Sequence, residues 1–385
     1  MQDNEKKPAL RFKGFTDPWE QRKLGELVEI GDIDHRMPET VADGIPYLMT
    51  GDFVGTNELN FDGTKMISEE DYCQLSQKIK PEKGDILFAR YASVGAARYV
   101  DFTRKFLISY SCAIIKKSKK INSKYLYHFI TSGKVQQQIK LEINTGSQAN
   151  IGIDSMKNHI VVSMPPLEEQ TKIADALSNL DHLITLHQRK YEKLVNIKKS
   201  MLDKMFPKNG ASVPEIRFKG FTDLWEQRKL GEMVDVCSGM DYKHLSEGDI
   251  PVYGTGGYML SVNKALSYDR NAVGIGRKGT IDKPYILKAP FWTVDTLFYA
   301  IPKDSKNIDF TFDVFQKVDW KKKDESTGVP SLSKIAINET SISTPSKLEQ
   351  ERIGSFFRNL DTLITLHQRE HIKPILEVKR VKRNE

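Results

Sequence analysis

Glycines at a fixed spacing are the first residues in this sequence whose pattern could do chemistry. GIGRKG, which begins at Gly274, contains the G-x-G-x-x-G spacing that binds dinucleotide phosphates at the start of a helix. Such a site needs a helix directly after the glycines, but Lys283 and Pro284 follow here and favour another strand. The pattern therefore predicts a glycine-rich turn between strands that displays Arg277 and Lys278.

No catalytic set accompanies this turn. The sequence has no G-x-x-x-x-G-K-[ST] phosphate loop, no H-E-x-x-H zinc motif and no G-x-S-x-G nucleophile elbow. The PPL at Pro165 lacks the aromatic residue that an adenine methyltransferase needs after two prolines, and the eight histidines do not cluster. We therefore expect a non-catalytic chain that binds neither a metal nor a cofactor itself.

The composition fits a polar globular protein of about two domains. The chain has 385 residues, of which 39% are hydrophobic and 28% charged, and its formal net charge is +7. A positive charge permits a polyanionic partner without requiring one. No apolar run is long enough for a membrane span, MQDNEKKPAL does not resemble a secretory signal, and three cysteines without metal spacing fit a reducing cytosol. We expect a cytoplasmic protein.

Two pairs of repeats organise the chain. FKGFTDPWEQRKLGELVE begins at Phe12 and FKGFTDLWEQRKLGEMVD at Phe218, and fifteen of the eighteen residues are identical. NLDHLITLHQRK begins at Asn179 and NLDTLITLHQRE at Asn359, and ten of the twelve residues match. The order is head, variable body, tail, and then the same again with a shorter body. Constant frames around different bodies favour a shared structural role for the frames and separate recognition roles for the bodies, although a recent recombination would leave the same pattern.

The first tail predicts a long helix. Its apolar residues recur at steps of four and three from Ile173 onward, which is a heptad seam. Pro165 and Pro166 suit the start of the helix, and Pro207 predicts its end near Phe206.

The second tail keeps the seam but carries Pro374 inside it. A proline within a helix costs about 3 kcal/mol, so we expect the second helix to be bent or shortened there. His187 and His367 occupy matching seam positions and fit polar residues that set the register better than metal ligands. The two seams most simply pack on each other, although a coil that only dimerises the protein has the same periodicity. The residues expected to pack between helices or against a partner subunit are Leu177, Leu180, Ile184, Phe357, Leu360 and Ile364.

The bodies predict short strands mixed with helices. Strand-like segments broken by glycine and proline surround Arg277, and GDILFARYASVG places Arg90 at the corresponding point of the first body. In each body a helix-like segment precedes a polar glycine loop, NTGSQAN from Asn144 and STGVPS from Ser326.

Taken together, these motifs resemble the specificity subunit of type I restriction–modification enzymes. The resemblance rests on the duplicated WEQRKLGE head, on GxGRKGT followed by FWTVDT, and on the P-x-x-x-EQ-x-x-I opening of each tail, and it covers essentially the whole chain. The first body departs from the pattern, because it has ARYASVG in place of GRKGT and ISYSC in place of WTVDT.

The resemblance implies an α+β fold with two tandem mixed α/β target-recognition domains, separated by two long conserved helices that form an antiparallel coiled coil with pseudo-twofold symmetry. The expected boundaries are 1–164 for the first recognition domain, 165–207 for the first helix, 208–344 for the second domain and 345–385 for the second helix. Each domain would read one half of a bipartite target in double-stranded DNA. Two modification subunits would methylate adenine with S-adenosylmethionine, and restriction subunits would use ATP and magnesium.

Candidate DNA contacts follow from this resemblance. Arginine and lysine at turns suit guanine edges or phosphates, and hydroxyl and amide groups on loops suit base edges, although each could equally be a solvated surface group. Lys321, Lys322 and Lys323 suit phosphates or a solvated face, whereas Trp19 and Trp225 favour packing. The candidate DNA-binding residues are Arg90, Tyr91, Ser93, Thr145, Ser147, Gln148, Asn150, Arg277, Lys278, Thr280, Thr327 and Ser331.

Two other functions fit parts of the pattern. A protein-interaction scaffold with two heads would also show variable bodies on constant frames. A nuclease site built from carboxylates could be hidden in weak spacing. Sequence-dependent, salt-sensitive binding of duplex DNA separates the first of these from the specificity function, and magnesium-dependent cleavage by the isolated chain would support the second.

Overall fold

The computed structural model describes residues 8, 10–146, 148–208, 211–303 and 307–381, with side chains through residue 368. It divides into two compact units, unit 1 (Met1–Thr185) and unit 2 (Leu186–Glu385), and each has its own hydrophobic core. In this part of the chain no helix is long and apolar enough to cross a membrane. Both units mix helices and strands, as predicted.

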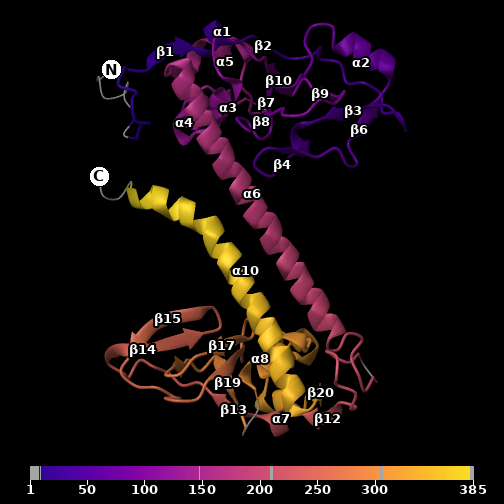
Figure 1. The fold of residues 1–385 in the computed structure, drawn as a ribbon, viewed down its shortest axis with the longest axis vertical. Coiled ribbons are helices and arrows are strands. Elements are labelled where there is room, and N and C mark those ends of the chain that lie inside the picture. The colour runs from indigo at the N-terminus through magenta and orange to yellow at the C-terminus, as the bar shows by residue number, and fades with distance from the viewer. Residues whose placement is uncertain (1–7, 9, 147, 209–210, 304–306, 382–385) are drawn as a thin grey trace. The chain divides into compact units, whose positions relative to one another are not determined.

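Unit 1 is built around a four-stranded antiparallel sheet (Figure 1). Apolar side chains form a cluster on each face of this sheet. Because side chains alternate along a strand, Ile86 and Phe88 pack with the helices whereas Leu87 packs with a second, three-stranded sheet. The first sheet has the order β2 (Ile30–Gly31), β10 (Cys112–Ile115), β7 (Ile86–Ala89) and β8 (Ala97–Tyr99). The second has the order β6 (Lys65–Ile67), β3 (Ile45–Leu48) and β9 (Leu107–Ile108), and the helices are α3 (Ser123–Thr131), α4 (Gly133–Leu141) and α5 (Ile153–His159).

Unit 2 repeats this plan in the same chain order. Val273 and Ile275 of its central strand pack with the helix cluster, and Ala272 faces the other side of the sheet. The four-stranded sheet has the order β13 (Val234–Ser238), β19 (Leu297–Pro302), β16 (Ala272–Gly276) and β17 (Tyr285–Leu287). The three-stranded sheet has the order β15 (Gly257–Val262), β14 (Glu247–Gly254) and β18 (Trp292–Thr293), and the helices are α8 (Ile308–Lys317), the 3-10 helix η3 (Trp320–Lys323) and α9 (Lys334–Asn338).

The greater length of the first body is explained by elements between β3 and β7. This segment contains a hairpin and a short helix, whereas the corresponding part of unit 2 is only the β14–β15 hairpin and its loops. The additional elements of unit 1 are η2 (Thr50–Asp52), β4 (Phe53–Val54), β5 (Glu58–Leu59) and α2 (Glu69–Leu75).

The repeated heads and tails are joined to each other within each unit. In unit 1, β1 (Glu20–Lys23) pairs with β11 (Val161–Met164), the strand that leads into the tail helix. In unit 2, β12 (Glu226–Lys229) pairs in the same register with β20 (Ser341–Thr344). The short helices α1 (Leu24–Leu27) and α7 (Leu230–Met233) follow the head strands.

An arginine–glutamate pair closes the same junction in both units. Arg11 donates from Nε and Nη2 to the buried Glu169 at 2.7 and 2.8 Å, and Arg217 makes the same two contacts with the buried Glu349. A bidentate guanidinium–carboxylate contact fixes the orientation of both side chains. The arginine directly before each head is therefore held at the first turn of the tail helix.

The head tryptophans pack, as predicted. Trp225 is buried between Phe206 and Phe310, with ring centroids 5.8 and 6.2 Å away. Trp19 is half-buried and meets Tyr125 edge-on at 6.4 Å.

The two tail helices match their predicted starts. The first, α6 (Leu167–Lys204), begins directly after Pro165 and Pro166 and ends close to Phe206. The second, α10 (Lys347–Val381), continues through Pro374, so of the two expected outcomes, a bend or a shorter helix, the shorter helix is excluded. A proline removes its own N–H···O=C bond, but its neighbours can keep theirs.

Within unit 2, the last part of α6 packs on the first part of α10. Phe357 and Leu360 are buried in a cluster against which Leu194 and Met201 of α6 pack. Lys198 forms an ion pair with Asp361 at 2.5 Å, and the Nδ1 atoms of His187 and His367 lie 3.2 Å apart. Ile184 and Ile364 are half-buried, whereas Leu177 and Leu180 are exposed, so packing of the latter two stays a prediction.

Candidate nucleic-acid interface

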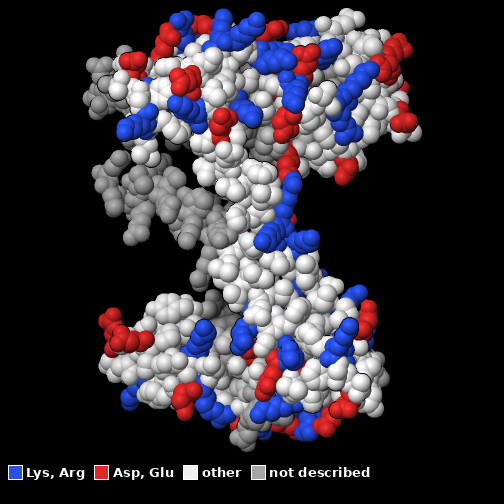
Figure 2. Space-filling model, viewed as in Figure 1, with Lys and Arg blue, Asp and Glu red and all other residues white. Residues whose placement is uncertain are grey.

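Charge alone does not locate an interface in this molecule. Figure 2 shows Lys and Arg side chains interspersed with Asp and Glu over the drawn face of each unit. The net charge of +7 is therefore not gathered into one field on that face. The position of the candidate residues in the fold is the better guide.

In unit 2, the turn after β16 is joined to the glycine loop by backbone hydrogen bonds. The N–H of Gly279 donates to the Pro330 carbonyl at 2.8 Å, and the N–H of Leu332 donates to the Arg277 carbonyl at 3.0 Å. Gly276 is required before the turn, because a Cβ there would lie 2.1 Å from the Thr280 carbonyl oxygen. The next element is strand β17, so the prediction of a turn between strands is confirmed.

This junction brings together the predicted residues of the second body. Arg277, Lys278 and Thr327 are exposed, and Thr280 and Ser331 are half-buried. The Arg277 guanidinium lies over the Phe298 ring, 5.8 Å from its centroid. The surface therefore presents two cationic side chains beside a loop hydroxyl.

Unit 1 has the same backbone junction at the corresponding place. The N–H of Ile151 donates to the Arg90 carbonyl at 3.1 Å, as that of Leu332 does to Arg277. Tyr91 forms a β-bridge with Asn150, and the loop is closed by N–H···O=C bonds between Asn144 and Asn150 of 2.8 and 3.3 Å. Two bodies of different sequence thus hold a turn and a loop in contact through equivalent atoms.

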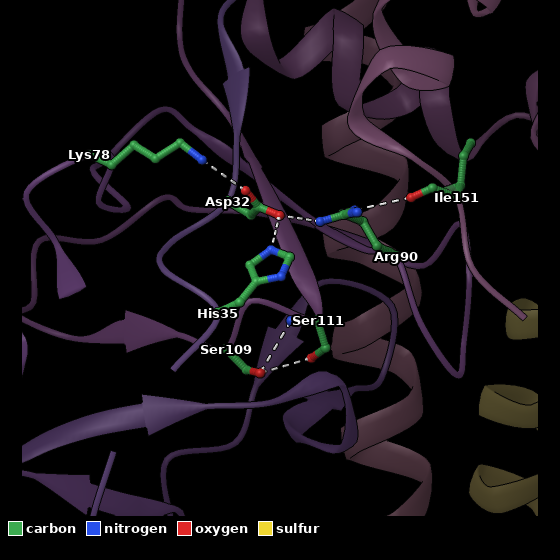
Figure 3. A network of polar contacts seen from close by, with 7 residues as sticks. All are labelled: Asp32, His35, Lys78, Arg90, Ser109, Ser111 and Ile151. Atoms are coloured by element: carbon green, nitrogen blue, oxygen red, sulfur yellow. Dashed lines mark hydrogen bonds and ion pairs between the residues drawn. The ribbon is translucent and has the colours of Figure 1, made fainter. Parts of the chain in front are cut away.

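The arginine at the two equivalent turn positions has opposite surroundings. Arg90 is buried, whereas Arg277 is exposed. Figure 3 shows that the Arg90 guanidinium lies between Asp32 and Ile151, with an ion pair to the first and an Nε–H bond of 3.0 Å to the carbonyl of the second. The expectation that the Arg90 guanidinium contacts DNA is corrected, because this group is buried and already bound to Asp32 and to the Ile151 carbonyl.

Asp32 also contacts two side chains besides Arg90. The Lys78 Nζ and His35 Nε2 atoms lie 3.1 and 3.0 Å from its carboxyl oxygens (Figure 3). Burial raises the pKa of Asp32, but the contacts with His35, Lys78 and Arg90 outweigh it, so this pKa lies below its ordinary value. Asp32 is therefore ionised at neutral pH and holds the turn from inside the unit.

The other predicted residues of the first body lie at or near the surface. Ser93, Thr145 and Gln148 are exposed, Tyr91 and Asn150 are half-buried, and Ser147 lies outside the described residues. Between them, Ala92 has a φ of 57°, a left-handed conformation that residues with a Cβ rarely adopt. Such strain tends to be kept at functional sites. The available side chains of this surface are neutral hydroxyl and amide groups.

The three lysines of η3 are exposed, but two of them are ion-paired. Lys321 lies 2.9 Å from Asp282, and Lys322 lies 3.1 Å from Asp319. Their contact with phosphates stays a prediction.

Two carboxylates at these junctions were missed at the level of sequence. Asp32 lies 58 residues before Arg90, so no local pattern connects them. Asp324 accepts hydrogen bonds from the backbone of Ser326 and Ser331, and an aspartate two residues before a serine in a glycine loop is a recognisable turn signal. Among the described residues there is no group of three or more His, Cys, Asp or Glu side chains that could hold a metal ion.

The family model described as the type I restriction modification DNA specificity domain matches residues 16–196 and 222–376. The chain belongs to this family. Each of the two matches covers one body with most of its head and tail, in agreement with a fold of two units.

Similar proteins are described as type I specificity subunits. The putative type I restriction enzyme MjaX specificity subunit of Methanocaldococcus jannaschii is 26% identical over 235 residues, which is 56% of this chain and 53% of that protein. The putative type I specificity subunit S.MpnORF89P of Mycoplasma pneumoniae is 23% identical over 274 residues, 68% of this chain and 80% of that protein. The chain spans about half the length of the curated M. jannaschii relatives it matches.

A solved structure has the same fold over nearly the whole chain. The S subunit of the type I restriction–modification system of M. genitalium superposes with a TM-score of 0.69 over 96% of both chains, at 18% identity. At that identity the likeness concerns the fold. It supports the tandem arrangement of two mixed α/β units.

Proposed function

We propose that this chain is the DNA-specificity subunit of a type I restriction–modification complex, in which each unit reads one half of a bipartite target in double-stranded DNA. The observation that carries the proposal is the equivalent junction of turn and loop in both units. The hydrogen bonds from Ile151 to Arg90 and from Leu332 to Arg277 join the same backbone atoms, while the exposed side chains differ. Two recognition surfaces that bind different DNA sequences need the same backbone junction but different exposed side chains.

The two surfaces suit different base edges. Arg277 and Lys278 in unit 2 match guanine, because an arginine can donate two hydrogen bonds to its O6 and N7 atoms. Unit 1 offers Ser93, Thr145 and Gln148, and amide side chains pair well with adenine.

The helices serve in this proposal as a spacer. We propose that α6 and α10 form an antiparallel coiled coil that relates the units by a pseudo-twofold axis. In support, residues of α6 in descending order meet residues of α10 in ascending order, from Lys198 with Asp361 to His187 with His367. Insertion of one heptad into α6 should then lengthen the unread spacer and leave both half-sites unchanged.

The partner subunits follow from the same assignment. We propose that two modification subunits, which bind S-adenosylmethionine, dock on the tail helices, and that restriction subunits bind ATP and magnesium. In this proposal the partner subunits carry the catalytic activities, this chain is not catalytic, and the complex is cytoplasmic. In support, the duplicated tails expose leucines at matching positions. These exposed residues are Leu183 and Leu186 in the first tail and Leu363 and Leu366 in the second.

Mapping of methylated adenine across the host genome, with and without the gene, tests the proposal. We expect one bipartite motif that is methylated only when the gene is present. A methylation map that does not change on deletion would contradict it. Binding of all duplexes with equal affinity by the chain with its modification subunits would contradict it as well.

A further inference from the structure

The loop that meets the Arg277 turn is closed by a single carboxylate. Asp324 Oδ1 accepts hydrogen bonds from the Ser326 N–H at 3.0 Å, the Ser326 hydroxyl at 2.8 Å and the Ser331 N–H at 2.9 Å. The Glu325 N–H also donates to the Ser331 carbonyl at 3.2 Å. Asp324 therefore ties the first residues of the loop to its last one.

The closed loop is the part that contacts the turn. Ser331 forms a β-bridge with Lys278, and the neighbouring Pro330 carbonyl accepts from the Gly279 N–H. Thr327 stands exposed within the loop that these contacts anchor. Loss of the Asp324 contacts would leave Ser331 less firmly held. The positions of Thr327, Lys278 and Arg277 relative to one another would then no longer be fixed.

An aspartate in this place is unfavourable by charge alone. Asp324 is exposed and directly follows Lys321–Lys323, on a surface proposed to face phosphates. The hydrogen bonds from the Ser331 and Ser326 N–H groups and from the Ser326 hydroxyl lower the pKa of its carboxyl, so it is ionised at neutral pH. A like charge facing DNA weakens association, so a carboxylate here needs a compensating structural role.

We propose that Asp324 is the positioning residue of the unit 2 recognition surface. Its carboxylate closes loop 324–331 so that the loop and the Arg277 turn face the same half of the DNA target. The inference rests on the proposed function and adds to it the residue that positions the loop and the turn for binding of one half-site. In unit 1 the corresponding support comes from the buried Arg90, whose Nε–H donates to the Ile151 carbonyl at the end of its loop.

Three variants of the full chain, each assembled with the modification subunits, separate positioning from charge. Asp324→Ala removes both the charge and the acceptor. Asp324→Asn removes the charge but keeps an oxygen that can accept from Ser326 and Ser331. Asp319→Ala is the matched control, because it removes an exposed carboxylate from the same segment, where its partner is Lys322.

The measurement is binding to the wild-type target duplex and to duplexes altered in one half at a time. We expect Asp324→Ala to weaken binding to the target about tenfold or more and to lose discrimination at one half only. Asp324→Asn should restore affinity to within about threefold of the wild type, and Asp319→Ala should bind all duplexes slightly more tightly. All three should melt like the wild type, since both carboxylates are at the surface.

The outcomes are distinct. If Asp324→Ala and Asp324→Asn both bind more tightly than the wild type, the carboxylate acts only through its charge and the inference is wrong. Unchanged discrimination in Asp324→Ala would overturn it too. A wild-type complex that does not distinguish the target from other duplexes would instead refute the proposed function.

Discussion

Unit 1 and unit 2 hold equivalent turns by different means. In unit 1, the arginine of the turn is withdrawn into the protein, where Asp32 and the Ile151 carbonyl engage its guanidinium. In unit 2, Arg277 remains exposed and the loop is fixed by Asp324 at the surface. The backbone bridge between turn and loop is nevertheless the same.

This difference separates support from recognition. In unit 1 the support is a buried ion pair, so the shape of the turn depends on the interior of the unit. In unit 2 the support is a surface carboxylate, and the arginine of the turn remains exposed. The arginine at the equivalent turn is thus a structural residue in unit 1 and a candidate DNA contact in unit 2.

The largest expected effect is on the stability of unit 1. Asp32→Ala leaves the Arg90 guanidinium buried without its carboxylate, and loss of one partner of a buried pair costs about 3–5 kcal/mol. Because folding lowers the pKa of Asp32, its stabilisation is present above the ordinary pKa of about 4 and is lost as the pH falls through the folded value. Hydrogen exchange of the β7 and β10 amides measures the free energy of unfolding of unit 1.

Arg277→Ala is the matched control for stability. We expect it to change the free energy of unfolding of unit 2 by no more than about 0.5 kcal/mol, because the side chain is exposed. If Asp32→Ala were as mild as Arg277→Ala, the contrast between internal and external support would be lost.

The next effect concerns DNA affinity. Arg277→Ala should weaken binding of the target by about 1–3 kcal/mol and relax the preference at one half-site, whereas Gln148→Ala should affect the other half. Competition binding with duplexes altered in one half measures both. Equal weakening on every duplex would instead place Arg277 on the phosphates.

The smallest effect concerns a buried carboxylate that, unlike Asp32, lacks a hydrogen-bonding partner for one oxygen. Asp313 in α8 is buried and its Oδ2 has no such partner among the described residues. Burial raises the pKa of its carboxyl well above the ordinary value, despite the nearby Lys198. A raised folded pKa means that stability is lost as the pH rises from the unfolded pKa towards the folded one.

Asp313→Asn should therefore stabilise unit 2 by about 1 kcal/mol at pH 8, and by less near pH 3, where the carboxyl is mostly protonated in the folded and the unfolded state. Thermal melts at the two pH values, with Asp319→Asn as the surface control, measure the difference. A gain that is equal at both pH values would contradict the assignment of the effect to this carboxyl.

Much of the fold follows from the sequence because its signals are local. The repeats gave the two-unit plan, the heptad spacing gave α6 and α10, and the glycines gave the turn at Arg277. Burial of Arg90 does not follow, because its carboxylate partner comes from Asp32 on a distant part of the chain. The exposure of Leu177 does not follow from the sequence either, since an apolar seam does not indicate which part of the helix is covered by another element.

Exchange of one body tests the central claim most directly. Residues 239–338 would be replaced with the corresponding body of a relative, the heads and tails would be kept, and methylated adenine would be mapped across the genome. The account predicts that one half of the bipartite motif changes while the other half and the spacer stay the same. A change in both halves would show that the units do not read independently and would contradict the account.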